Sequence, residues 1–559
     1  MLMALLSFLL LNSNRQLLTG DEPRYLIYAV SFIRHGVFIM QPSEWSRLSQ
    51  HVVGHPSAAL PTGAGGAFLM NGVYIPMLLS PVAGLFKLWG LRLATLLVGI
   101  AGLFCLYQLL RRAAGPLPAL ASLAVAAFSM PLLPYLHLFY METFVFALVC
   151  WAWLRLQTHR RSLPGDLLTT LVIVSIPFAH LRGAAVAALL FAGLLSIVIR
   201  QRLWARAATI CLIALISGLA FVLLNLSIYG AVTGPVNTAR PPLPTQWLPV
   251  LSMQLFNVRH GLFAYAPLWV LGYAGLWASL GLRGNPKFSI GRQALILATA
   301  AALTGVGVNP GECWPARFWV LSVPMLSVGL CVWMERARGI AAATCFVLLL
   351  LATLTNTVFF FKVPNAFLEN RQTSTTYDAL FDRFGLLDAN VLLPVENDDE
   401  TNRIAAESLA LGTGAFILLM ALALRYRAAS IPALVLLAAT IDLARVHRVR
   451  DPVVTANLHR LQIDLPRPVK VVTVEIGRGG QTWFAPPGYS RFQVTTLGRF
   501  GNTTSRHAAN QDVTVACRSG VHAIDITTDG VDLQAQAEYR LRLLATSSLL
   551  RRLTADGSC

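Results

Sequence analysis

The chain has 559 residues, of which 55% are hydrophobic and only 13% are charged. This balance excludes an ordinary soluble domain and indicates a polytopic membrane protein. The formal net charge of +18 does not indicate a nucleic-acid partner, because the basic residues lie at the ends of apolar blocks rather than in one patch.

Apolar blocks of about 20 residues recur along residues 1–444, and a block that crosses a bilayer must be helical to satisfy its backbone. We predict about 13 membrane helices. The first block is kept as a span because it lacks the basic region and cleavage site of a signal peptide. The predicted spans are 1–18, 92–110, 117–136, 142–157, 166–180, 183–199, 205–228, 261–281, 290–308, 317–334, 339–361, 405–424 and 428–444.

The apolar block 68–90 decides the orientation of every later helix. Pro76, Pro81 and Lys87 interrupt it, and we predict a juxtamembrane or re-entrant helix on the outer face. With a cytoplasmic N-terminus, the basic turns then follow the positive-inside rule. Those turns carry Arg111, Arg112, Arg155, Arg160, Arg161, Arg200, Arg202, Arg206, Arg283, Lys287, Arg292, Arg336, Arg338, Arg425 and Arg427.

This topology gathers many ionisable residues on the outer face of the membrane, which is the periplasmic face of the inner membrane if the host is a Gram-negative bacterium. A single histidine or arginine there is more often an interface anchor than a functional group, but their convergence on one side predicts chemistry at that face. The residues are Asp21, Glu22, Arg24, His51, His55, His137, Glu142, His180, Arg182, Arg259, His260, Glu312 and Arg317.

Two adjacent carboxylates, Asp21 and Glu22, open the first outer loop, 19–91. Acidic residues number only 26 in the chain, and a carboxylate at a bilayer boundary is costly to desolvate. The structural alternative is a helix N-cap, because the sequence Asp-Glu-Pro suits a helix start.

After residue 444 the pattern changes to short alternating runs at 470–476, 491–497, 512–517, 521–527 and 538–544. Such runs, separated by turn residues, predict a small β domain over 445–559 on the outer side. A long outer loop, 362–404, precedes the last two spans. Cys517 and Cys559 would lie in an oxidising compartment, which leaves a disulfide between them open.

Five segments of the chain combine charged, aromatic and turn residues near the predicted outer ends of the spans. They are Gly20-Asp21-Glu22-Pro23-Arg24-Tyr25-Leu26, Tyr140-Met141-Glu142, Pro177-Phe178-Ala179-His180-Leu181-Arg182, His260-Gly261-Leu262-Phe263-Ala264-Tyr265-Ala266-Pro267 and Trp314-Pro315-Ala316-Arg317-Phe318. These segments resemble motifs of the GT-C superfamily of polytopic glycosyltransferases, whose relatives include protein O-mannosyltransferases and the aminoarabinose transferase of lipid A. Met141 departs from the Tyr-Pro-Glu found in similar bacterial members, and Asn257 stands where an aspartate is expected.

The resemblance implies transfer of a hexosyl or pentosyl unit from a polyprenyl-phosphate donor to a glycan, lipid or protein acceptor. Such transfer needs a carboxylate to take the acceptor proton and cations to hold the phosphate. Asp21 is the candidate base, and Glu22 is expected to orient the acceptor or hold a divalent cation, although no metal-type spacing is visible. The candidates for donor phosphate or substrate binding are Arg24, Tyr25, Glu142, His180, Arg182, Arg259, His260 and Arg317.

Two other classes of function stay open for this chain. A polymerase or ligase that moves a lipid-linked oligosaccharide would differ only in the size of its donor, which the sequence does not disclose. A transporter or flippase is expected to show internal repeats and polar residues at mid-membrane. The sequence has no clear repeat, and its ionisable residues lie mainly at span ends, which favours the glycosyltransferase.

Overall fold

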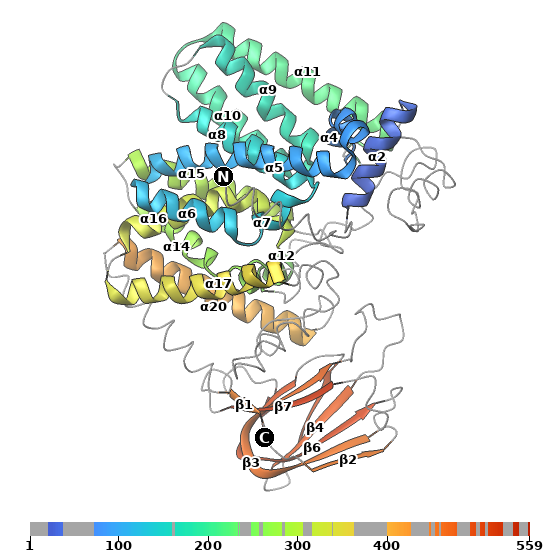
Figure 1. The fold of residues 1–559 in the computed structure, drawn as a ribbon. Helices are drawn as coiled ribbons and strands as arrows, with labels where there is room; N and C mark the ends of the chain where they lie inside the picture. Colours follow the sequence, from blue (N-terminus) through green and yellow to red (C-terminus); the bar gives the residue numbers. More distant parts are fainter. Residues whose placement is uncertain are drawn as a thin grey trace.

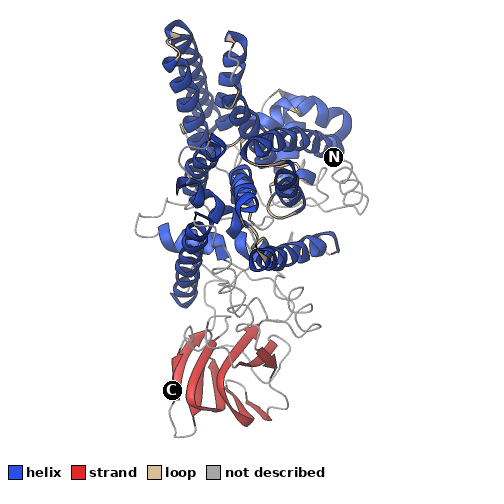
Figure 2. Ribbon diagram, turned by 90° about the vertical axis from the view of Figure 1, so that its left-hand side faces the viewer, coloured by secondary structure: helices blue, strands red, loops and turns tan. Residues whose placement is uncertain are grey.

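The computed structural model of the chain describes residues 21–36, 72–158, 162–232, 234, 247–256, 261–281, 286–305, 316–337, 339–362 and 400–425, and strands between 446 and 558. The predicted spans 1–18 and 428–444 and most of the loop 362–404 lie outside the described residues. The described helices lie side by side in a bundle, and the strands form a separate body (Figures 1 and 2). The expected fold class, a helical membrane protein with a C-terminal β region, is confirmed.

The helices are mostly apolar along their whole length. Four of those described are long and apolar enough to cross a membrane, namely Ser80–Ala113, Leu181–Arg200, Trp204–Tyr229 and Arg317–Arg336. Several shorter apolar helices accompany them, so the total of about 13 stays a prediction. The described helices are α2 (Glu22–His35), α4 (Tyr74–Leu78), α5 (Ser80–Ala113), α6 (Pro116–Phe128), α7 (Leu132–His137), α8 (Met141–Leu156), α9 (Leu163–Ala179), η2 (Leu181–Gly183), α10 (Ala184–Arg200), α11 (Trp204–Tyr229), α12 (Trp247–Phe256), α13 (Leu262–Tyr265), α14 (Trp269–Gly281), α15 (Pro286–Gly305), η4 (Arg317–Ser322), α16 (Val323–Arg336), α17 (Ile340–Lys362) and α20 (Glu400–Arg425).

The block 68–90 is interrupted, as its prolines and Lys87 predict. It contains the short helix α4 and the first part of α5, and Lys87 (φ 53°, ψ −145°) breaks the helix inside α5. Positive φ is costly for a residue with a Cβ, so this break is a defined feature of the fold. The segment after the break, which contains the predicted span 92–110, runs on to Ala113.

Two predicted spans are broken rather than continuous. The span 117–136 divides into α6 and α7 around Pro131, and the span 261–281 divides into α13 and α14 around Pro267. Proline cannot donate the helical hydrogen bond, and its ring clashes with the preceding turn. These breaks leave backbone groups inside the bundle that need other partners.

Helix α17 supplies a partner at each of these two breaks. The Thr357 hydroxyl donates to the carbonyl of Phe128 at 2.8 Å, at the first break. The Asn356 amide donates to the carbonyl of Tyr265 at 2.7 Å, at the second break. Buried polar side chains on one helix thus allow its neighbours to be discontinuous.

Helices α14 and α16 approach each other closely at glycine. A Cβ built on Gly275 would lie 1.9 Å from the carbonyl oxygen of Gly329, so no larger residue fits there. Small residues commonly permit such contacts between membrane helices. The contact fixes α16, which continues directly from η4, the element that carries Arg317.

The C-terminal strands form one eight-stranded sheet with the order β1-β7-β3-β6-β4-β5, in which β2 also pairs with β3 and β8 with β6. All pairings are antiparallel except β6 with β8. The predicted runs 512–517 and 521–527 are one long strand, since β6 continues across both. The strands are β1 (Val446–Arg448), β2 (Val453–Asn457), β3 (Arg460–Gly477), β4 (Phe492–Gly498), β5 (Thr503–Ala508), β6 (Val513–Thr528), β7 (Arg540–Thr546) and β8 (Gly557–Ser558).

The residues that precede the two C-terminal cysteines are register partners in the sheet, because Ala516 of β6 pairs with Ser558 of β8. The side chain of Cys517 and the whole of Cys559 lie outside the described residues. The disulfide, and the division of the chain into domains 1–444 and 445–559, therefore stay predictions.

Basic turn residues gather at one end of the helical bundle. The Arg112 guanidinium donates to the carbonyl of Leu154 at 3.3 Å, so the C-terminal ends of α5 and α8 meet. The Arg336 guanidinium donates to the carbonyl of Leu424 at 3.1 Å, which brings together the C-terminal ends of α16 and α20. The starts of α2, α8 and η4 meet at the opposite end, where the predicted functional residues lie.

We predict that this arrangement follows the positive-inside rule. A reporter fused after residue 112 should report the cytoplasm, and one fused after residue 450 should report the outer side. Paired alkaline phosphatase and fluorescent protein fusions would measure both. A cytoplasmic reporter at residue 450 would mean that the block 68–90 crosses the membrane and that the assigned sides are wrong.

Candidate active site

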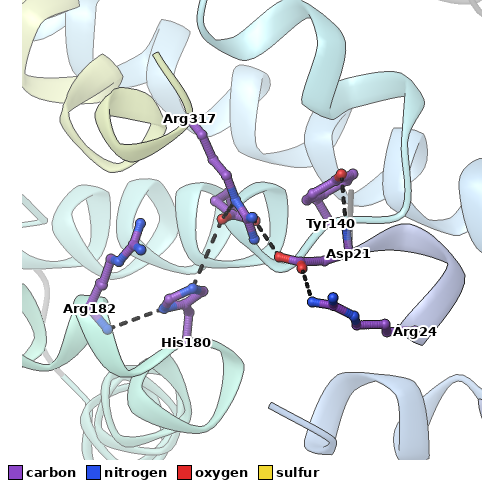
Figure 3. A network of polar contacts seen from close by, with 7 residues as sticks. Asp21, Arg24, Tyr140, His180, Arg182 and Arg317 are labelled. Carbon is purple, nitrogen blue, oxygen red and sulfur yellow. Dashed lines mark hydrogen bonds and ion pairs between the residues drawn. The ribbon is translucent and has the colours of Figure 1, made fainter. Parts of the chain in front are cut away.

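Asp21 stands at the start of α2 but does not cap it. Its backbone lies at the N-cap position, its side chain makes no capping hydrogen bond, and Pro23 is the second residue of the helix. The carboxylate instead meets two guanidinium groups: Oδ1 accepts from Arg24 at 3.1 Å, and Oδ2 accepts from Arg317 at 2.5 Å (Figure 3). Asp21 therefore stands at the helix start, as the structural alternative expected, but its carboxylate pairs with arginines instead of capping the helix.

Arg317 joins three distant parts of the chain. Its Nη1 donates to Asp21 and its Nε donates to Oε1 of Glu142, both at 2.5 Å. These partners are 296 and 175 residues away in the sequence. The guanidinium carbon also lies 4.9 Å from the ring centre of Tyr140, within range of a cation–π contact.

The backbone before Arg317 is unusual. Ala316 has φ 58° and ψ 23°, the left-handed conformation that residues with a Cβ seldom adopt. This residue turns the chain into η4, whose first residue is Arg317. Backbone of this kind occurs often at functional sites, where the surrounding structure holds it.

His180 and Arg182 come from the turn between α9 and α10. The backbone N–H of Arg182 donates to Nδ1 of His180 at 3.2 Å. Because Nδ1 accepts, the proton of the neutral ring lies on Nε2. Nε2 is 3.9 Å from Oε1 of Glu142, so the imidazole faces the carboxylate that Arg317 also contacts (Figure 3).

A pocket with about 330 Å³ of empty space, which includes open solvent, lies beside these side chains. Arg182 stacks on the ring of Phe318, with its guanidinium carbon 3.5 Å from the ring centre. The pocket thus combines two cationic groups with an apolar wall. Its lining residues are Glu142, Val145, His180, Arg182, Gly183, Thr304, Arg317, Phe318 and Leu321.

Glu22 has a different environment from Asp21. It is fully buried, and its two oxygens accept from Nε and Nη2 of Arg92 at 2.8 and 2.6 Å. Its Oε1 also accepts from the backbone N–H of Phe139 at 2.9 Å. The bidentate pair therefore joins the first turn of α2 to α5 and to the segment before α8.

Tyr25 and Tyr140 build the support beneath Asp21. The two buried rings pack edge-to-face at 6.2 Å, and Tyr25 also packs on Phe139 at 6.0 Å. The Tyr140 hydroxyl accepts from the backbone N–H of Asp21 at 3.2 Å. The position of Asp21 is thus fixed through both its backbone and its neighbours.

The predicted site residues divide into three groups. Asp21, Arg24 and the pocket residues Glu142, His180, Arg182 and Arg317 lie together, while Glu22 and Tyr25 are buried in the support of the site. Arg259 and His260 lie outside the described residues.

The sequence motifs include Tyr140 and Phe318 but predict no role for them, and they do not include Arg92. Arg92 carried a signal, because an arginine at the start of a predicted membrane span needs a buried partner. The roles of Tyr140 and Phe318 depend on ring contacts between distant segments, which one sequence does not show.

The described residues contain no group of three His, Cys, Asp or Glu side chains that could hold a metal ion. Asp21 is flanked by two arginines, and both oxygens of Glu22 are occupied. The sequence left a divalent cation at this pair open, and the described part of the chain offers no ligand set for it.

Comparisons with known proteins gave a structural likeness only. No family model and no curated protein sequence matches the chain. Two crystal structures of ArnT from Cupriavidus metallidurans resemble it, one in the apo state and one bound to undecaprenyl phosphate. The first has a TM-score of 0.39 and 14% identity, covering 75% of this chain and 71% of that one. The second has a TM-score of 0.39 and 16% identity, covering 78% and 74%.

At a TM-score of 0.39 and identities of 14% and 16%, this likeness carries no argument about the superfamily or the chemistry of this chain.

The Glu22–Arg92 pair should be essential for stability. Glu22→Gln leaves a buried guanidinium without its counter-charge, which typically costs about 3–5 kcal/mol. The double variant Glu22→Leu with Arg92→Met should recover much of that loss, because it removes both charges. Unfolding in detergent would measure the free energy of each variant.

A matched control is Glu335→Gln, which alters an exposed contact to the Gly115 N–H at the other end of the bundle. It should change stability by about 0.5 kcal/mol or less. A Glu22→Gln protein as stable as this control would show that the buried pair does not hold the site together.

Proposed function

We propose that this protein is a membrane glycosyltransferase of the GT-C kind. It transfers a sugar from a polyprenyl-phosphate donor to a hydroxyl group of an envelope glycan, lipid or protein at the outer face of the bacterial inner membrane. The observation that supports this most is the contact between Asp21 and Arg317, because it places a carboxylate beside a cationic pocket.

The pocket suits an anionic phosphate group. Arg182 and Arg317 both line it, and a guanidinium can bind two phosphate oxygens at once. The Arg182 guanidinium carbon lies over the Phe318 ring, and this contact limits the positions that the cation can adopt. An anionic lipid phosphate is therefore a better fit than a neutral ligand.

In the proposed reaction, the acceptor oxygen attacks the anomeric carbon of the donor sugar and loses its proton to Asp21. The bond between the anomeric carbon and the phosphate oxygen breaks, and its electron pair leaves with the polyprenyl phosphate. Arg182 and Arg317 stabilise the negative charge on that leaving phosphate. The only chemical groups that this requires from the chain are a base and cations.

Donor binding also explains how Asp21 becomes available as a base. Both of its oxygens contact arginine, and Arg317 is the arginine that also lines the pocket. A bound phosphate competes with Asp21 for this guanidinium. As Arg317 turns to the phosphate, one carboxylate oxygen is released to accept the proton of the acceptor.

Asp21→Asn should abolish transfer while the protein still folds, because it keeps the shape of the side chain and removes the base. We expect the rate of transfer to fall by about 10²–10⁴-fold. The assay compares envelope and lipid-linked glycans of a deletion strain that carries either the wild type or the variant, followed by rates in reconstituted vesicles with the lipid donor.

The matched control for this variant is Asp166→Asn. Asp166 is also buried and paired with an arginine, Arg206 at 2.9 Å, but it lies in the first turn of α9, at the opposite end of that helix from His180. This control should keep near wild-type activity. Retention of most activity by Asp21→Asn would remove Asp21 from the mechanism.

Lysine at the two pocket arginines should have different effects. Arg182→Lys keeps the charge but loses the two-point contact, so the apparent KM for the donor should rise with little change in kcat. Arg317→Lys also disturbs Asp21 and Glu142, so kcat should fall as well. Donor titrations measure both constants, and unchanged kinetics in both variants would return these arginines to a structural role.

A further inference from the structure

Glu142 has one carboxylate oxygen that its neighbours in the described part of the chain leave unused. Its Oε1 accepts from Arg317 and faces His180. Its Oε2 is buried, and none of the described residues places a donor within hydrogen-bond distance of it. The side chain is only 8% exposed and lines the pocket.

A buried acceptor without a donor is costly, more so when the group is charged, so such an atom commonly marks a place where a ligand binds. The partner of Oε2 has to be a hydrogen-bond donor, because a second anion would be repelled. The pocket therefore has two chemically distinct sides: Arg182 and Arg317 suit an anion, and Glu142 suits a hydroxyl or an ammonium group.

The two sides are adjacent because Arg317 belongs to both. Its Nε is held by Glu142, while its Nη1 contacts Asp21. A ligand that fills the pocket should thus carry its donor group within a few bonds of its phosphate. A sugar linked directly to a phosphate meets this requirement, and a bare lipid phosphate does not.

We propose that Oε2 of Glu142 accepts a hydrogen bond from a hydroxyl or amino group of the donor sugar, and that Glu142 thereby distinguishes a glycosylated polyprenyl phosphate from the bare lipid. This inference rests on the proposed function and adds a sugar-binding role at the same site. Glu142 is then a specificity-determining residue, while the arginines bind a phosphate that both lipids share.

The test is the variant Glu142→Gln. Glutamine keeps the size of the side chain and can still present an oxygen to Arg317, but it then replaces Oε2 with an N–H₂ group. The atom that faces the ligand changes from an acceptor to a donor. The probes are undecaprenyl phosphate and a panel of undecaprenyl phosphates that carry glucose, mannose, galactose, arabinose or 4-amino-arabinose, and native mass spectrometry measures their binding.

We expect the wild type to bind at least one glycosylated lipid more tightly than the bare lipid. Glu142→Gln should weaken binding of that lipid by about tenfold to a hundredfold, as for a hydrogen bond to a charged group, and change binding of undecaprenyl phosphate little. Arg182→Lys should weaken both lipids alike, and Asp166→Asn should affect neither. A preference for the amino sugar alone would identify the donor group as an ammonium, and a preference for neutral sugars as a hydroxyl.

Three results would overturn the inference. Equal loss of both lipids in Glu142→Gln would mean that Glu142 acts only by holding Arg317. An unchanged preference would mean that Oε2 does not contact the sugar, and a wild type without any preference would exclude a sugar subsite. Binding of no undecaprenyl lipid at all would instead overturn the proposed function.

Glu142→Asp is a second variant for the case that the glutamine protein does not fold. It keeps the charge opposite Arg317 but withdraws the carboxylate by one methylene. The preference for the glycosylated lipid should again fall, and an unchanged preference would contradict the proposal.

Discussion

The contact of Arg317 with Asp21 and Glu142 is the interaction on which the rest of the site depends. One guanidinium holds together the start of α2, the start of α8 and the turn into η4, which are far apart in the sequence. Charged groups at the end of a membrane bundle are expensive to desolvate. These are tolerated because Arg317 pairs with both carboxylates and Arg24 places a second positive charge beside Asp21. Arg317 also lines the pocket, so a ligand that binds there must alter this network.

The surrounding fold is built to keep these groups in place. The buried Glu22–Arg92 pair fixes the first turn of α2, and Tyr140 receives the Asp21 N–H while its ring lies under Arg317. Further inside the bundle, polar side chains of α17 satisfy the backbone where neighbouring helices break. Such rigid support holds the charged groups in place before the ligand binds, so that they stabilise the ligand without first having to reorganise.

Much of this architecture follows from the sequence. Hydrophobic blocks predict the helices, alternation predicts the strands, and scarce carboxylates at the outer ends of spans lead to Asp21 and Glu142. The sequence could not separate Asp21 from Glu22, because their roles depend on which arginine each one meets. The sequence also does not reveal the two interrupted helices whose backbone groups α17 satisfies. Pro131 and Pro267 are compatible with kinked as well as interrupted helices. Contacts such as Arg182 on Phe318 bring together segments that only the folded chain makes neighbours.

The central claim is that Arg182 and Arg317 receive a lipid phosphate beside Asp21. A cryo-electron microscopy structure of the protein in nanodiscs with undecaprenyl phosphate tests it most directly. The account predicts phosphate oxygens about 2.7–2.9 Å from guanidinium nitrogens of both arginines, with Arg317 turned away from Asp21. A phosphate bound elsewhere, with the contact between Arg317 and Asp21 intact, would contradict it.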